Sequence, residues 1–248
     1  MGWEVLGPLI AGAVAGGFIN GLAGFGTSLF ALGFWLQVFP PVEAVAISVV
    51  VGTISGIQGL WVVRRTVRQT LRRLSRFLVP GLVGIPLGIA TLAFIDPQVL
   101  KLLIAGFLIL YGLFFLSRGR LPKFERPTPL LDMVIGFLGG ILGGLAGLSG
   151  ALPAMWCALR PWPRHETRAV LQPYNFAILC LSAITLAARG AMTSQTLLAL
   201  AIAVPVSVLA AQSGIFVFQR LTDTGFRWVL IGLMFASGLL LLLRTVLL

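Results

Sequence analysis

Charged residues are scarce in this chain, and acidic ones are scarcer still. Asp, Glu, Lys and Arg make up 10% of the 248 residues, and seven carboxylates stand against 18 cationic side chains. A soluble domain carries about 25% charged residues. With 58% hydrophobic residues and a mean hydropathy of +1.02, the composition instead predicts an all-α polytopic membrane protein. The net charge of +11 is then explained by membrane topology, and we expect no nucleic-acid partner.

Residues that carry chemistry are equally few. The chain has one histidine and two cysteines, Cys157 and Cys180, which are too few for a metal constellation. It has no Ser/His/Asp spacing, P-loop or dinucleotide fingerprint. We therefore expect no catalytic residue, no metal and no cofactor, and neither enzymatic turnover nor ATP-driven transport. Both cysteines are expected to pack as small hydrophobes without forming a disulfide.

Glycine, by contrast, is abundant, and it concentrates in two breaks inside long apolar runs, at 16–28 and 139–150. At a constant offset of 123 residues, 12 of the 31 positions from Gly16 to Ala46 are identical to their counterparts. The matches include a Pro-x-x-Glu-x-x-Ala pattern after each break. We interpret this as an internal duplication of two membrane repeats, 1–124 and 125–248, within one transmembrane domain.

Each break predicts two half-helices in place of one span. The first apolar run, Val5–Val38, would be about 50 Å long as a continuous helix, against a hydrocarbon core of about 30 Å. A re-entrant hairpin with its tip at the glycines fits better, because irregular backbone at membrane depth is tolerated where it is buried in protein or lines a cavity. The second run, Met133–Leu159, is predicted to form the same hairpin.

Three spans are predicted after each hairpin. They are Ala44–Val63, Phe77–Ile95 and Val99–Leu116 in the first repeat, and Ala169–Ala188, Thr193–Phe218 and Trp228–Leu248 in the second. A loop with six arginines, Arg64–Arg76, is expected between the first two spans. Ser117–Pro129 is the expected linker between the repeats, and Arg160–Arg168 is a further basic loop.

The distribution of basic residues favours re-entrant hairpins. In that arrangement the loops 64–76, 118–126, 160–168 and 220–227 all face the cytoplasm, with 15 cationic residues inside and three outside. Hairpins that cross the membrane would give 12 and six. Because each repeat then has three spans, the second repeat is inverted relative to the first. Inverted repeats with discontinuous helices are typical of secondary transporters, and we expect this one in the cell (inner) membrane.

The hairpin tips are the predicted substrate site. At each tip a half-helix begins, and its free N–H groups and positive dipole end favour an anion. Hydroxyl and amide side chains nearby can donate further hydrogen bonds. The candidate substrate-binding residues are Asn20, Gly24, Gly26, Thr27, Ser28, Gly147, Ser149, Gly150, Gln172, Asn175 and Gln212.

Two structural alternatives stay open for these residues. Glycines can serve only close helix packing, which is the role we expect for Gly17, Gly21, Gly140 and Gly144. Polar side chains in spans can be interhelical hydrogen-bond partners without touching a substrate.

The sign of the substrate follows from what the spans lack. All seven carboxylates fall at predicted span ends or in loops, so no buried carboxylate is expected to hold a cation. No buried arginine is expected either. A small anion would therefore be held by backbone N–H groups, hydroxyls and amides.

The motifs resemble those of the TauE/SafE family of sulfite exporters. The likeness rests on GLAGFG at 21–26 and PPxEA at 40–44, and on their counterparts at 144–153 and 166–169. It implies a carrier of small sulfur-containing anions, such as sulfite, sulfoacetate or other organosulfonates, usually outward across the bacterial cytoplasmic membrane. It also places Gly24, Gly26, Gly147 and Gly150 in the family's tip motif, where this chain departs from the commoner Gly-Gly-Gly version.

We therefore predict a secondary transporter that exports such an anion by alternating access, with the anion and the lipid bilayer as its partners. A passive anion channel, a carrier of another small carboxylate or oxyanion, and a membrane enzyme or scaffold on sulfur metabolites remain alternatives, as does a homo-oligomer. The sequence indicates neither the direction of transport nor a coupling ion.

Overall fold

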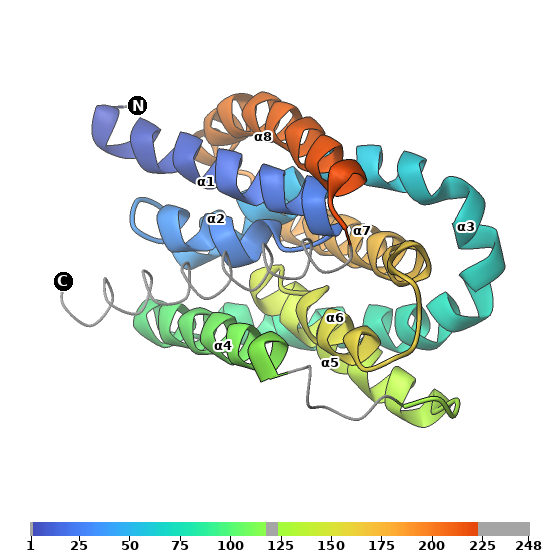
Figure 1. The fold of residues 1–248 in the computed structure, drawn as a ribbon. Helices are drawn as coiled ribbons and strands as arrows, with labels where there is room; N and C mark the ends of the chain where they lie inside the picture. The colour runs from blue at the N-terminus through green and yellow to red at the C-terminus, as the bar shows by residue number, and fades with distance from the viewer. Residues whose placement is uncertain (1, 118–123, 223–248) are drawn as a thin grey trace.

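The computed structural model describes residues 2–117 and 124–222 (Figure 1). Within these ranges the chain is helical and has no β-strand; the helices are α1 (Trp3–Ala23), α2 (Thr27–Trp35), α3 (Pro41–Leu92), α4 (Pro97–Ser117), α5 (Pro129–Ala146), α6 (Ala151–Ala158), α7 (Arg164–Ala188) and α8 (Ser194–Arg220). Five of them, α1, α3, α5, α7 and α8, are long and apolar enough to cross a membrane. The all-α polytopic fold is thereby confirmed. The predicted span Trp228–Leu248 lies outside the described residues.

The first glycine break separates α1 from α2 and reverses the chain. Gly24 and Gly26 have φ values of 84° and 97°, in the left-handed region that residues with a Cβ rarely adopt. α2 then packs back along α1. The indole N–H of Trp35 donates to the Leu9 carbonyl at 3.1 Å, so the return arm ends level with the early part of α1.

The second break forms a similar hairpin from α5 and α6. Gly147 ends α5 with a φ of 66°, and its N–H donates to the Gly143 carbonyl at 2.8 Å. The indole N–H of Trp156 then donates to Asp132 Oδ1 at 2.7 Å, which fixes the end of α6 beside the start of α5. At the offset of 123 residues, Asp132 is the counterpart of Leu9. In both hairpins, an indole N–H of the second helix thus donates to the same relative position of the first helix.

The largest difference from the sequence prediction is α3. We expected two spans joined by a loop at Arg64–Arg76, but one uninterrupted helix of 52 residues runs from Pro41 to Leu92. A straight helix of that length would extend about 78 Å; Figure 1 shows that α3 bends round one end of the bundle and returns. No glycine or proline occurs in residues 60–79, and arginine favours helix, so nothing in this stretch ends the helix. Below, residues 41–63 are its first arm and 77–92 its second arm.

Two equivalent contacts interlock the halves of the chain. Helix α1 packs on α8, and α5 packs on the second arm of α3, backbone against backbone. The contacting pairs are Gly17–Ser207 and Gly21–Ala211 in the first contact, and Gly140–Gly81 and Gly144–Ile85 in the second. The glycines of α1 and α5 correspond at the offset of 123, so the duplicated pattern makes the same contact twice. The packing role predicted for these four glycines is confirmed.

Replacing Gly140 with alanine is expected to destabilise the protein by about 1–3 kcal/mol, the usual cost of overpacking. A Cβ at this position would overlap the Gly81 carbonyl, which cannot move without separating α5 from α3. The matched control is Gly7→Ala in α1, where a Cβ meets nothing within 4 Å and alanine gains up to about 1 kcal/mol of helix propensity. Thermal unfolding in detergent measures both. A Gly140→Ala midpoint equal to that of Gly7→Ala would contradict the contact.

Basic segments that are far apart in the sequence gather at one end of the bundle. Side chains from the bend of α3, from the segment before α5 and from the segment after α6 line a single cavity there. The guanidinium of Arg168, near the start of α7, lies 4.1 Å from the Phe218 ring near the end of α8. Parts of three of the four loops that we expected on one face of the membrane, 64–76, 118–126 and 160–168, therefore lie together at this end.

Candidate functional site

The two hairpin tips touch in the interior of the bundle. Gly147 of the second tip lies against the hydroxyls of Ser28 and Ser48, and Gly150 lies against the side chain of Phe25. All five residues are buried. A Cβ at either glycine would collide with the opposite side of this contact, so the absence of a side chain allows the tips to meet.

Two helices flank the tips. The first arm of α3 presents small residues at helical spacing, namely Ser48, Gly52, Ser55, Gly56 and Gly59, all of them buried. Opposite them, α7 presents Arg168, Gln172 and Asn175, which fall on one face because they are four and three residues apart. The exposed fractions of these three residues are 3%, 0% and 2%. The tips thus lie between a small-residue face and a polar face.

The polar face carries a buried positive charge beside the first tip. Arg168 donates from its terminal nitrogens to the carbonyls of Gly21, at 2.8 Å, and Leu22, at 3.3 Å. Carbonyls at a helix C-terminus bear partial negative charge, which favours a cation there. The Nε atom of Arg168 is buried without a hydrogen-bond partner. Our expectation that no arginine would be buried is therefore wrong.

Several buried polar atoms around the first tip have no hydrogen-bond partner within the described chain. They are Asn20 Oδ1, Thr27 Oγ1, Arg168 Nε and Gln172 Oε1. The amide orientations are set by their other ends, since Asn20 Nδ2 donates to the Gly52 carbonyl at 3.0 Å and Gln172 Nε2 to the Gly56 carbonyl at 3.1 Å. Buried polar groups are normally satisfied, so these atoms are the candidates at the tips for contact with a ligand or water. They offer two hydrogen-bond donors and two amide acceptors.

The other hydroxyls at the tips are engaged within the protein. Ser149 Oγ donates to Asn175 Oδ1 at 2.5 Å. Ser28 Oγ donates to Ser48 Oγ at 3.0 Å, and Ser48 Oγ in turn donates to the Val45 carbonyl. The bonds of Ser149 and Ser28 link different helical segments, as in the structural alternative that we held open, and the bond from Ser48 to Val45 lies within α3. The first tip is therefore the one with unengaged polar atoms.

The structure brings ten of the eleven predicted residues into the buried region around the tips. The exception is Gln212, whose side chain is exposed on α8. Its neighbours Ala211 and Gly214 face α1, so Gln212 lies on the other side of the helix. The periodicity of α8 explains this placement, because the small residues and not the amide lie at its contact face.

One carboxylate is buried as well, contrary to our expectation. Asp132, in the first turn of α5, is 2% exposed and lies 3.4 Å from an Nη atom of Arg160, itself 4% exposed. Sequence reasoning placed both in solvated segments, because nothing in the pattern shows that Trp156 and residues 124–128 cover them. Since its negative charge already has a cationic partner, Asp132 is no open cation site.

Arg168 is the functional candidate that sequence reasoning missed. We assigned it to the loop Arg160–Arg168, but α7 begins at Arg164 and carries it inward. A usable signal existed, since Arg168, Gln172 and Asn175 form one polar stripe on an otherwise apolar helix. Elsewhere in residues 2–117 and 124–222, no three His, Cys, Asp or Glu side chains gather to form a metal site.

Comparison with known families places the chain as follows. Residues 9–241 match the family described as sulfite exporter TauE/SafE, a range that includes both hairpin tips and every candidate site residue. No curated protein matches the chain.

Proposed function

This chain belongs to the TauE/SafE family of sulfite exporters, and on that premise we propose that it carries sulfite or a small organosulfonate out of the cell. The family is one of transporters, and five apolar helices of spanning length make this chain a multi-pass membrane protein. The proposal adds a substrate class, a direction and a site.

The substrate site that we propose lies at the hairpin tips and centres on the first one. The observation that carries it is the set of buried polar atoms without a partner at this tip: the Thr27 hydroxyl in the first turn of α2, and the guanidinium of Arg168, which is held against the end of α1. First-turn N–H groups have no partner inside their own helix, so backbone, hydroxyl and guanidinium donors are all available at this buried tip. An oxyanion suits them, because hydrogen bonds to a charged acceptor are the strong ones. The amide oxygens of Asn20 and Gln172 can accept from a protonated anion or from a bound water.

In the membrane we propose that both hairpins are re-entrant and that the two repeats are inverted. α2 and α6, of nine and eight residues, would extend only about 12–14 Å and are too short to cross. Figure 1 shows α1 and α5 beginning at opposite ends of the bundle, which supports the inversion. The end that gathers the arginines is assigned to the cytoplasm by the positive-inside rule.

Single cysteines in a cysteine-free background test this topology. Arg65 and Arg189 are both exposed, at the bend of α3 and at the end of α7 respectively. We expect a cysteine at Arg189 to react with an impermeant maleimide applied outside intact cells, and one at Arg65 to react only after the membrane is opened. Labelling of the Arg65 cysteine from outside would reverse the proposed orientation.

The proposed mechanism is alternating access, in which the tip site faces each side of the membrane in turn. An inside-negative potential favours the exit of an anion by about 2.3 kcal/mol per charge per 100 mV. Export of a monoanion thus needs no second ion to be favourable.

Counterflow of labelled sulfite and sulfoacetate in proteoliposomes tests the function. A carrier is expected to exchange labelled for unlabelled anion saturably and to accumulate label transiently against unlabelled substrate. Flux that rises linearly with concentration and shows no counterflow would favour the passive anion channel. Absence of flux with both anions would overturn the proposed substrate class and direct the search to other small acids.

A further inference from the structure

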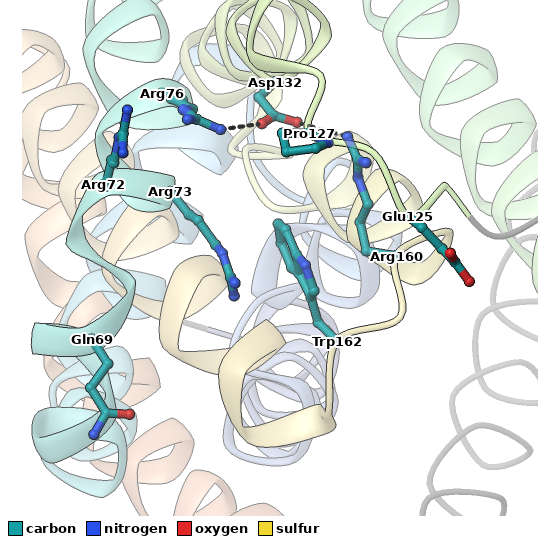
Figure 2. A pocket seen from close by; sticks show the side chains of 9 residues that line it. All are labelled: Gln69, Arg72, Arg73, Arg76, Glu125, Pro127, Asp132, Arg160 and Trp162. Atoms are coloured by element: carbon teal, nitrogen blue, oxygen red, sulfur yellow. Dashed lines mark hydrogen bonds and ion pairs between the residues drawn. The ribbon is translucent and has the colours of Figure 1, made fainter.

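A second place where positive charge gathers lies outside the hairpin tips, at the end of the bundle where α3 bends (Figure 2). It is a cavity of about 340 Å³, within the size range of ligand sites and large compared with the roughly 30 Å³ that one water occupies. Its lining holds four arginines, Arg72, Arg73, Arg76 and Arg160, against two carboxylates, Glu125 and Asp132.

On one side of the cavity the charged groups are already paired with each other. Arg160 is bound by the carbonyls of Phe124, at 3.1 Å, and Arg126, at 2.6 Å, and by the Thr128 hydroxyl. Its guanidinium also lies 3.4 Å from Asp132 Oδ1. The charges of Arg160 and Asp132 therefore offset one another, and the donors of Arg160 are largely occupied.

Arg76 of α3 is not satisfied in this way. The side chain of Arg76 is only 22% exposed, and its Nη1 lies 3.7 Å from Asp132 Oδ2, which is too far for a hydrogen bond. Within the described chain Arg76 makes no other polar contact. Its five N–H donors thus face a cavity without an acceptor at bonding distance. A guanidinium so placed carries a desolvation cost that a bound anion would offset.

Arg73 and Trp162 line the cavity beside Arg76. Arg73 pairs with Glu166 Oε2 at 2.5 Å, and its guanidinium lies 4.8 Å from the centre of the Trp162 ring. Figure 2 shows Arg73 and Arg76 extending from α3 toward the second repeat, with Arg76 directed at Asp132 and the Trp162 ring between Arg73 and Arg160. The open space therefore has charge on one wall and an aromatic face on another.

We propose that this cavity binds an oxyanion of the phosphate type, held chiefly by Arg76 with Arg73 beside it. A guanidinium presents a planar fork that matches two oxygens of a phosphate group. Two sources supply that chemistry. Basic cavities between helices at the cytoplasmic end of a membrane protein accept anionic lipid headgroups, and an indole such as that of Trp162 suits the membrane interface. A free oxyanion in solution is the other source. The proposal is independent of the proposed transport function.

Binding to purified, delipidated protein in detergent tests the free source. Inorganic phosphate is titrated at constant ionic strength, with the thermal unfolding midpoint as the readout. We expect a saturable rise in midpoint for the wild type, and an apparent affinity at least about ten-fold weaker in Arg76→Gln, because a charge-assisted hydrogen bond is lost. The matched control is Arg65→Gln, an exposed arginine of the same helix outside the cavity, which should bind as the wild type does. Arg73→Gln provides a second variant if Arg76→Gln does not fold.

Native mass spectrometry tests the lipid source in the same variants. Phosphatidylglycerol is expected to stay bound to the wild type and to Arg65→Gln, and to be lost from Arg76→Gln. Dependence on Arg76 for the lipid alone assigns the cavity to a headgroup, and dependence for phosphate alone assigns it to a free oxyanion. If neither ligand distinguishes Arg76→Gln or Arg73→Gln from Arg65→Gln, the proposal is wrong. Sulfite counterflow is measured separately, so a failure of one proposal does not affect the other.

Discussion

Replacing Arg168 with glutamine is expected to abolish sulfite counterflow, with a fall of at least about 100-fold in the initial rate at low substrate. Removing one partner of a buried charge–hydrogen-bond pair costs about 2–5 kcal/mol, which corresponds to roughly 30-fold to several thousand-fold in an equilibrium constant. Arg168 supplies the buried positive charge beside the first tip. Initial rates at low and saturating sulfite in proteoliposomes measure the effect.

Arg168 also holds the end of α1 through the carbonyls of Gly21 and Leu22, so its loss can act through the fold. Two controls separate the effects. Arg168→Lys keeps the charge but cannot reproduce the planar two-point contact, and it should retain a measurable fraction of the transport that glutamine loses. Arg65→Gln removes an exposed arginine and should transport as the wild type does. Wild-type rates in a folded Arg168→Gln protein would remove Arg168 from the site.

Replacing Thr27 with valine is expected to raise the half-saturating sulfite concentration about ten-fold or more without lowering stability. A hydrogen bond to a charged group contributes about 1.5–3 kcal/mol. Valine has nearly the shape of threonine, and Thr27 Oγ1 has no partner within the described chain. The substitution therefore removes no internal hydrogen bond. Counterflow and thermal unfolding of one preparation give the two readouts.

The matched control for Thr27→Val is Ser207→Ala. Ser207 is likewise buried with an unpartnered hydroxyl, but it lies at the contact of α8 with α1, so its loss should leave the half-saturating concentration unchanged. Ser149→Ala tests the second tip, and it should also cost about 1 kcal/mol of stability through the bond to Asn175. Saturable flux that Thr27→Val leaves unaltered would move the site away from the first tip.

Features that depend on local backbone chemistry could be read from the sequence. Both helix breaks follow from glycine, because Gly24, Gly26 and Gly147 take up backbone angles that other residues avoid. The close contacts of α1 and α5 follow from small residues four apart. The duplication carried these conclusions from one half of the chain to the other.

Features that depend on long-range packing could not be predicted from the sequence. The stretch 64–76 reads as a loop by charge, yet its arginines are compatible with a helix, and the choice depends on how α3 bends around the bundle. Arg168 and Asp132 are ionic residues near span ends, where solvation is the usual outcome, and only tertiary cover from other segments makes them buried. Gln212 shows the converse, because its burial depends on the side of α8 that meets α1.

The interlocked glycine contacts have a consequence for the motion in the proposed transport mechanism. Helix α8 belongs by sequence to the second repeat but is attached to the first hairpin, and the second arm of α3 is attached in the same way to the second hairpin. The chain has thus exchanged helices between its halves, as protomers do in a domain-swapped dimer. A motion that separated residues 1–124 from residues 125–248 as two rigid halves would break both contacts. For the proposed alternating access, these contacts favour α1–α2–α8 as one moving unit and α5–α6 with residues 77–92 as the other, joined by the curved middle of α3.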